Sequence, residues 1–190
     1  MKIEYSKQTL NHPNPIARFA HQNRHRKCIL LANNLLNSKT EGIIDYGCGQ
    51  GTFIKELRKK NFNFVYGYEP FMEQLQICSY ILSDEKLIPR GNIELVTLFE
   101  TIEHLDLKEL DLFFKFCKSC LNKTGKILVS APIEIGPAVI LKDFIRSIFF
   151  KRAMEYNFIE LIKSGLFGMN IKRSDKIKSS HKGFDFRKLI

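Results

Sequence analysis

The chain has 190 residues, is 44% hydrophobic, and carries 30 Lys and Arg against 20 Asp and Glu, a formal net charge of +10. This length suits a single domain with a proper core, and no apolar run approaches the roughly 18 residues of a membrane span. The basic balance favours acidic partners such as nucleic acid, anionic lipid or phosphorylated sugars, although solubility alone also explains it. Residues 1–5 lack the apolar region of a secretory signal, so we expect a cytoplasmic protein.

Five cysteines, odd in number and scattered, favour reduced thiols over a disulfide framework. Cys117 and Cys120 have the CxxC spacing of metal ligands, but no second pair or histidine cluster accompanies them in the sequence. They fall in a helical pattern. We therefore predict that they are half-buried helix positions and assign no metal site.

Residues 1–36 are predicted to form an irregular arm and then helix. Residues 1–15 are polar and contain Pro13 and Pro15. Between Ile16 and Leu36 the apolar residues fall mostly at helical spacing, interrupted by a polar run at 21–27. One long helix or two short ones would lead into the first strand.

Residues 43–53, IIDYGCGQGTF, indicate a buried strand that breaks into a glycine-rich turn and then a helix. Gly47, Gly49 and Gly51 allow a sharp turn with positive φ and a close approach by a ligand. The unpaired N–H groups and the dipole of the following helix suit a ligand that carries a carboxylate or hydroxyls. The spacing differs from the dinucleotide pattern G-x-G-x-x-G. A tight turn without a ligand is the alternative.

Residues 64–70 indicate a second strand that ends in an acid, Glu69, 18 residues beyond Gly51. In a parallel α/β sheet such an acid lies beside the glycine loop, where its two oxygens can accept both hydroxyls of a ribose. The alternative is a strand-end carboxylate in solvent. Residues 71–81 then read as a helix. Residues 80–90 contain no convincing third strand, and Asp84 is a candidate adenine contact by position only.

The next apolar run, residues 93–99, predicts a central strand, followed by a segment that borders the ligand crevice of an open α/β sheet. Phe99 would pack against a bound ligand there, and His104 could reach a substrate. A histidine can accept a proton at neutral pH. Helix capping or a structural hydrogen bond explains His104 equally well.

Residues 107–121 are amphipathic, 122–125 form a turn, and 126–132 predict a fifth strand. Five βα units imply right-handed crossovers and a parallel sheet covered on both faces. The apolar stretch 138–166, dotted with Lys and Arg, suits a lid, a membrane-surface helix pair or ordinary core helices. Residues 181–190 resemble the start of a further helix, with no sixth or seventh strand. The fifth strand would then be an uncovered edge, through which a homodimer could form.

Three places together resemble the class I S-adenosylmethionine-dependent methyltransferases: the glycine loop, Glu69, and residues 95–105, where an acid is followed by His and Leu. The resemblance spans roughly residues 29–136 and implies an α/β, Rossmann-like three-layer sandwich with a mostly parallel sheet that lacks the C-terminal strand pair. It also implies a single methyltransferase domain over 1–190. Its parts are N-terminal arm and helices 1–40, cofactor-binding core 41–135, helical lid insertion 136–182 and a truncated C-terminal element 183–190.

The cofactor implied by the resemblance is S-adenosylmethionine, with S-adenosylhomocysteine as product and no metal required. The implied cofactor-binding residues are Asp45, Gly47, Cys48, Gly49, Gly51, Glu69, Pro70 and Phe99. His104 is the candidate catalytic residue.

The resulting functional prediction is methyl transfer to an O or N atom of a small molecule, such as a sugar or a lipid-linked intermediate. Peripheral membrane contact would accompany a lipid-linked acceptor. RNA methylation is the second choice because of the +10 charge. A non-catalytic cofactor-binding or scaffold protein is the third.

Overall fold

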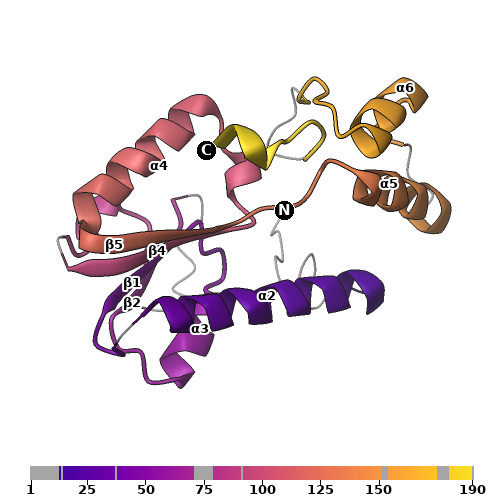
Figure 1. The fold of residues 1–190 in the computed structure, drawn as a ribbon. Helices are drawn as coiled ribbons and strands as arrows, with labels where there is room; N and C mark the ends of the chain where they lie inside the picture. The colour runs from indigo at the N-terminus through magenta and orange to yellow at the C-terminus, as the bar shows by residue number, and fades with distance from the viewer. Residues whose placement is uncertain are drawn as a thin grey trace. The chain divides into compact units, whose positions relative to one another are not determined.

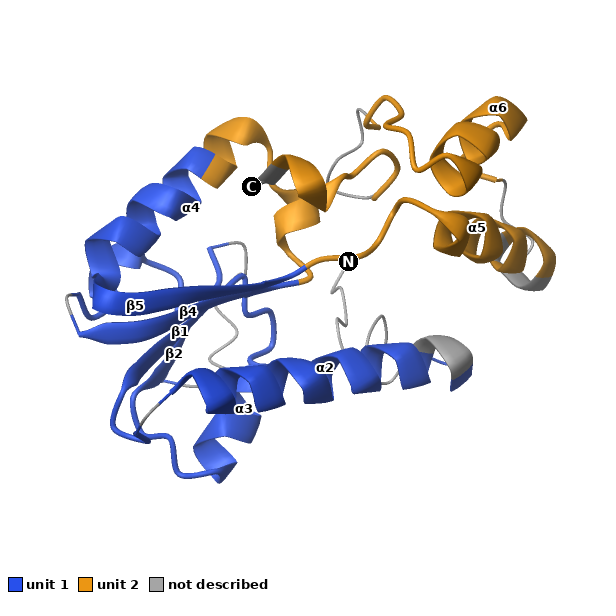
Figure 2. Cartoon of the chain, in the orientation of Figure 1, with its two compact units in different colours: residues 1–99, 111–130 blue, residues 100–110, 131–190 orange. Residues whose placement is uncertain are grey.

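The computed structural model describes residues 13, 15–36, 38–70, 79–90, 92–150, 154–174 and 180–189. The chain divides into two compact units (Figure 2). The first unit comprises Met1–Phe99 and Asp111–Ser130, and the second unit comprises Glu100–Leu110 and Ala131–Ile190. Each unit has its own packing.

A parallel five-stranded sheet forms the centre of the first unit. Its strands are β1 (Gly42–Tyr46), β2 (Val65–Tyr68), β3 (Ile81–Leu82), β4 (Ile93–Phe99) and β5 (Leu121–Ser130). The strand order is β3-β2-β1-β4-β5, and every neighbouring pair is parallel. The chain order reverses at β1, which has β2 on one side and β4 on the other. The carboxyl ends of β1 and β4 therefore flank the point where open α/β sheets bind ligands.

Helices cover both faces of this sheet. The helices α2 (Pro15–Leu35) and α3 (Thr52–Lys59) lie on one face, and α4 (Leu107–Cys120) lies on the other (Figure 1). Beneath α4, the Phe113 ring packs edge-on against Tyr46 with centroids 5.0 Å apart. The opposite side holds a cluster of buried apolar residues: Ile29, Ala32, Ile43, Phe53, Ile54, Leu57, Phe62, Val65 and Leu95. The predicted α/β fold class is thus confirmed, and the N-terminal helix is one long element.

The strand boundaries differ from the sequence prediction in two places. β3 exists although the sequence showed no convincing third strand, because a strand of two residues is too short to produce a pattern; Gly67 N donates to Tyr80 O at 2.8 Å there. β5 begins at Leu121 and not at 126, because Leu121 pairs with Ile93 across an irregularity in the β4 register. The predicted helix 71–81 lies outside the described residues up to 78, and Ile81 belongs to β3.

The second unit is built from short helices. They are the 3-10 turn η2 (Ile102–His104), α5 (Pro137–Phe150), α6 (Phe158–Leu161), the π-helical turn η3 (Ile162–Leu166) and the 3-10 helix η4 (Phe186–Leu189). Its apolar core contains Val139, Tyr156 and Leu161. A Cβ on Gly165 would lie 2.3 Å from Ile140, so η3 approaches α5 closely. None of the helices in the described ranges combines the length and apolar character needed to span a bilayer.

Candidate functional site

The glycine loop follows β1 and adopts the backbone that only glycine takes readily. Gly47, Gly49 and Gly51 have φ of 73°, 51° and 69°. Gly47 N donates to Tyr68 O of β2 at 2.8 Å, and Gly51 N donates to Cys48 O at 2.9 Å. The predicted turn with positive φ is therefore present.

Gly49 and Gly51 serve different purposes. A Cβ on Gly49 would meet nothing within 4 Å, so the space beside it is open. A Cβ on Gly51 would lie 2.6 Å from Ile81 Cδ1, so that glycine is required by packing. Gly49 is the position in the loop where a ligand can approach the backbone.

A third glycine supports the loop from β2. A Cβ on Gly67 would lie 2.5 Å from Cys48 Sγ and 2.4 Å from Ile54 Cδ1. The Cys48 side chain therefore packs where Gly67 leaves room. The sequence analysis did not identify this role, although an isolated glycine inside an otherwise bulky strand is the pattern of close approach.

Glu69 lies at the end of β2 and joins the loop. It is only 9% exposed, and its Oε2 accepts a hydrogen bond of 3.0 Å from Gly49 N. This position differs from a strand-end carboxylate in solvent. Pro70 follows it and is exposed. The carboxylate therefore lies beside the open space at Gly49.

Asp45 is buried beneath the loop, within β1. Thr97 Oγ1 of β4 donates to Asp45 Oδ1 at 2.7 Å, and the two residues are register partners. Burial raises the pKa of Asp45 to about 7, and the Glu69 charge adds to this, whereas the Thr97 hydrogen bond opposes it. Sequence reasoning missed Thr97, whose signal was a single polar residue within an apolar strand.

Phe99 ends β4 at the same edge of the sheet as the glycine loop. Its ring contacts Phe53 of α3 edge-on, with centroids 4.7 Å apart and an interplanar angle of 83°. The structure therefore brings Asp45, the loop glycines, Glu69 and Phe99 together in the first unit. Asp84, the candidate adenine contact, is exposed and caps the 3-10 helix η1 (Glu85–Leu87) by accepting from Lys86 N.

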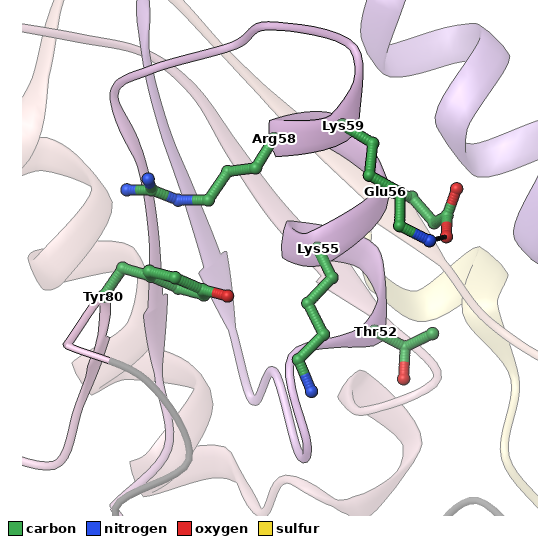
Figure 3. Close-up of a pocket in the computed structure, with 6 residues that line it drawn as sticks. All are labelled: Thr52, Lys55, Glu56, Arg58, Lys59 and Tyr80. Atoms are coloured by element: carbon green, nitrogen blue, oxygen red, sulfur yellow. Dashed lines mark hydrogen bonds and ion pairs between the residues drawn. The ribbon is translucent and has the colours of Figure 1, made fainter.

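A hollow on the surface of α3 is separate from these residues (Figure 3). It is lined by Thr52, Lys55, Glu56, Arg58, Lys59 and Tyr80. The Arg58 guanidinium lies 4.1 Å from the centre of the Tyr80 ring, and Lys59 pairs with Glu56 at 2.8 Å. None of the predicted cofactor-binding residues lines this hollow, so we do not assign the cofactor to it.

His104 belongs to the second unit. Its ring lies 4.9 Å from that of His181, and both imidazoles are half-buried near the buried carboxylate of Glu103. The predicted catalytic residue is therefore part of a cluster that sequence reasoning did not foresee, because His181 is 77 residues further along the chain.

A second buried carboxylate, Glu134, lies beside this cluster. It pairs with Lys142, accepts from Tyr156 OH at 3.3 Å, and lies 3.6 Å from His181 Nδ1. Although burial opposes it, the hydrogen bond from His181 and the Lys142 charge lower the pKa of Glu134 below its ordinary value. Sequence reasoning singled out none of these partners of Glu134.

The CxxC pair lies in α4 as predicted. Cys117 and Cys120 are buried, and burial raises their pKa values to about 12 and about 11. Such thiols are poor metal ligands because a metal binds the thiolate.

The comparisons with known proteins agree with the fold. The model of a family described as methyltransferase domain matches residues 19–184. A methyltransferase described as SAM dependent, from Archaeoglobus fulgidus, is 20% identical with a TM-score of 0.49, over 64% of this chain and 59% of its own. The PH0226 protein from Pyrococcus horikoshii OT3 is 18% identical with a TM-score of 0.52, over 68% of this chain and 66% of its own.

The chain thus spans less than two thirds of either solved protein. No curated protein matches it. Since the family model covers most of its length, the chain belongs to the methyltransferase domain family, which confirms the resemblance that the glycine loop, Glu69 and residues 95–105 indicated.

Proposed function

We propose that the chain is an S-adenosylmethionine-dependent methyltransferase that methylates an O or N atom of a small molecule. The observation that carries this proposal is the hydrogen bond between Glu69 and Gly49, beside open space at the carboxyl edge of β1 and β2. A nearly buried carboxylate next to a glycine with open space suits vicinal hydroxyls, such as those of a ribose.

The residues of the first unit fit this cofactor. Glu69 would accept from the ribose hydroxyls, and the loop from Gly47 to Gly51 would hold the methionine end near the N-terminus of α3. Phe99, fixed by Phe53, would offer a flat apolar surface to the adenine. When bound, S-adenosylmethionine supplies a methyl group on a sulfonium for direct displacement. The contribution of the protein is chiefly to position that group against the acceptor atom.

The second unit suggests an acceptor with an apolar part. On α5, Leu141, Phe144 and Ile148 share one face and are each more than half exposed. Phe158, Ile159, Leu166 and Phe167 of the α6 and η3 region are also exposed. Exposed apolar surface of this kind is typical of ligand or membrane contact. A lipid-linked intermediate or a sugar therefore remains our first choice, with His104 as the group that would accept a proton from the acceptor.

RNA is the second candidate acceptor, favoured by the net charge of +10. Binding to RNA would weaken steeply with added salt because bound cations release counterions from the phosphates. A small uncharged acceptor would show little salt dependence.

Calorimetric titration with S-adenosylhomocysteine tests the cofactor site. Glu69→Ala should weaken binding by more than about 1 kcal/mol, because it removes charge-assisted hydrogen bonds. Glu56→Ala is the matched control, because Glu56 is on the outer side of α3 and pairs only with Lys59 in the printed ion pairs of the described residues. It should bind as the original chain does.

Two outcomes would overturn this proposal. Equal affinity of the original chain and Glu69→Ala would remove Glu69 from the cofactor site. Absence of binding to the folded chain would favour the non-catalytic scaffold reading. If the cofactor binds, an acceptor screen comparing lipid-linked sugars with RNA, at low and high salt, separates the two acceptor classes.

A further inference from the structure

Three metal-ligating side chains converge in the second unit, away from the residues that the cofactor proposal uses. A carboxylate oxygen of Glu103 and one ring nitrogen each of His104 and His181 lie within 4.8 Å of one another. Glu103 is 1% exposed, so its carboxylate is held in the interior of the unit. Two imidazoles and one carboxylate form a common ligand set for first-row divalent metals.

We propose that Glu103, His104 and His181 bind a divalent transition-metal ion such as Zn²⁺. This inference is independent of the cofactor site. The three ligands leave at least one coordination position for water or for an oxygen of the acceptor.

Glu134 orients one of the ligands. His181 Nδ1 lies 3.6 Å from Glu134 Oε1, whereas His181 Nε2 lies 4.0 Å from Glu103 Oε1. A proton on Nδ1 would face the Glu134 carboxylate, and the lone pair of Nε2 would then be directed to the Glu103 side. Metal-binding histidines ordinarily have such a carboxylate on the second ring nitrogen, which fixes the tautomer and strengthens the ligand.

Arg173 fixes the backbone that carries the other two ligands. Its guanidinium donates to the backbone carbonyls of Glu103 and, at 3.5 Å, of Leu105. These bonds hold both ends of the turn that contains His104. The positions of Glu103 and His104 are therefore set by main-chain contacts, which leaves the side chains available for an ion.

The distances require a modest contraction on binding. Two ligands at about 2.0–2.2 Å from one ion lie at most about 4.4 Å apart, compared with the 4.8 Å limit of this cluster. The two half-buried imidazoles can supply the adjustment by side-chain rotation, while the buried Glu103 remains in place.

An ion at this site would change the role of His104. An imidazole that coordinates through one nitrogen and carries a proton on the other has no lone pair left to accept a proton. Acceptor activation would then rely on the ion, which lowers the pKa of a coordinated hydroxyl or water.

The test is Co²⁺ binding, followed by visible absorption, and Zn²⁺ binding, followed by equilibrium dialysis, on the full chain without an affinity tag. We expect one ion per chain, with imidazole-dependent Co²⁺ bands. Glu103→Gln and His181→Ala should each weaken binding at least tenfold. Glu134→Gln, which only orients His181, should weaken it by about 10- to 100-fold. His21→Gln, which removes a histidine from α2, is the matched control and should leave binding unchanged.

Circular dichroism and S-adenosylhomocysteine binding report whether each variant is folded, so a misfolded variant is recognised as such. Failure of the folded original chain to bind Co²⁺ or Zn²⁺ would overturn the proposal and leave the cluster as an ion-pair network. Binding that persists equally in Glu103→Gln and His181→Ala would also overturn it. If Glu134→Gln binds as tightly as the original chain, the orienting role of Glu134 is wrong.

Discussion

The two units bury different kinds of side chain. The first unit has a cluster of nine buried apolar residues against its sheet. The second unit has an apolar cluster of three buried residues, Val139, Tyr156 and Leu161. It also buries four carboxylates, those of Glu103, Glu134, Asp143 and Asp185.

The carboxylates of the second unit are connected to donors. Asp143 accepts from Glu155 N at 3.2 Å, and Asp185 accepts from Arg187 through two nitrogens at 2.9 Å. Apolar burial is non-directional and depends on area, whereas a buried charge is tolerated only with well-placed partners. The comparison teaches that the stability of the first unit depends on volume, and that of the second unit on particular hydrogen bonds.

Removing core volume should have the largest effect, and only in the first unit. Leu57 is 0% exposed, and Leu57→Ala should destabilise by about 2–5 kcal/mol through lost burial and the cavity left behind. Hydrogen exchange followed by mass spectrometry should show faster exchange in β1, β2 and α3 and little change in α5. Leu87→Ala, at a position 65% exposed, is the control and should change little. Equal acceleration in both units would mean that they unfold together.

Asp45 should make the first unit less stable as the pH rises. Its pKa in the folded chain is about 7, above the ordinary 3.8. Between these values the unfolded chain is ionised there and the folded chain is protonated, so the free energy of unfolding falls with pH, by at most roughly 4 kcal/mol at pH 7 and above.

The check on Asp45 is urea unfolding by circular dichroism at about pH 5 and about pH 8, in the original chain and in Asp45→Asn. The amide cannot ionise, so the variant should lose part of the pH dependence. An identical pH dependence in both chains would contradict the assignment.

Removing one hydrogen bond should affect the second unit moderately. Tyr156→Phe deletes the hydroxyl that donates to Glu134 at 3.3 Å, with an expected loss of about 1.5 kcal/mol, the low end for a bond to a charged group. Exchange should accelerate around α5 and η3. Tyr66→Phe, in β2 of the first unit, is the control and should stay within about 0.5 kcal/mol. No change in Tyr156→Phe would mean that the hydroxyl hydrogen bond adds nothing.

The smallest expected change in stability is that of Gly49→Ala. Its φ of 51° costs a side chain about 1 kcal/mol, and the Cβ meets nothing within 4 Å. Gly51→Ala should lose more, because its Cβ would also lie 2.6 Å from Ile81 Cδ1. Urea midpoints compare the two, and calorimetry should show that Gly49→Ala weakens S-adenosylhomocysteine binding despite its mild effect on folding. Unaltered affinity would show that no ligand approaches Gly49.

The first unit was largely predictable because its signals are local. The loop glycines and the acid after β2 can be recognised within a few residues of each other, and the strand pattern around them gives the sheet. β3 escaped because it has two residues. Thr97 escaped because its importance depends on Asp45, which comes from another strand.

The second unit was less predictable because its contacts join distant residues. His181 meets Glu103 and Glu134 across long separations, and nothing near His181 in the sequence marks it as part of a cluster. Apolar periodicity identified α5, but polar partnerships of this kind have no periodicity. A sequence pattern therefore describes a unit built on apolar burial better than one built on buried charge.

The packing of Cys48 over Gly67 has an evolutionary consequence. Because a Cβ at position 67 would occupy the space of the Cys48 sulfur, the sizes of these two side chains are tied to one another. In homologous chains a larger residue at one position would require a smaller one at the other, so the two positions should vary as a pair. Divergence of the loop is thus limited by a residue that no ligand needs to touch.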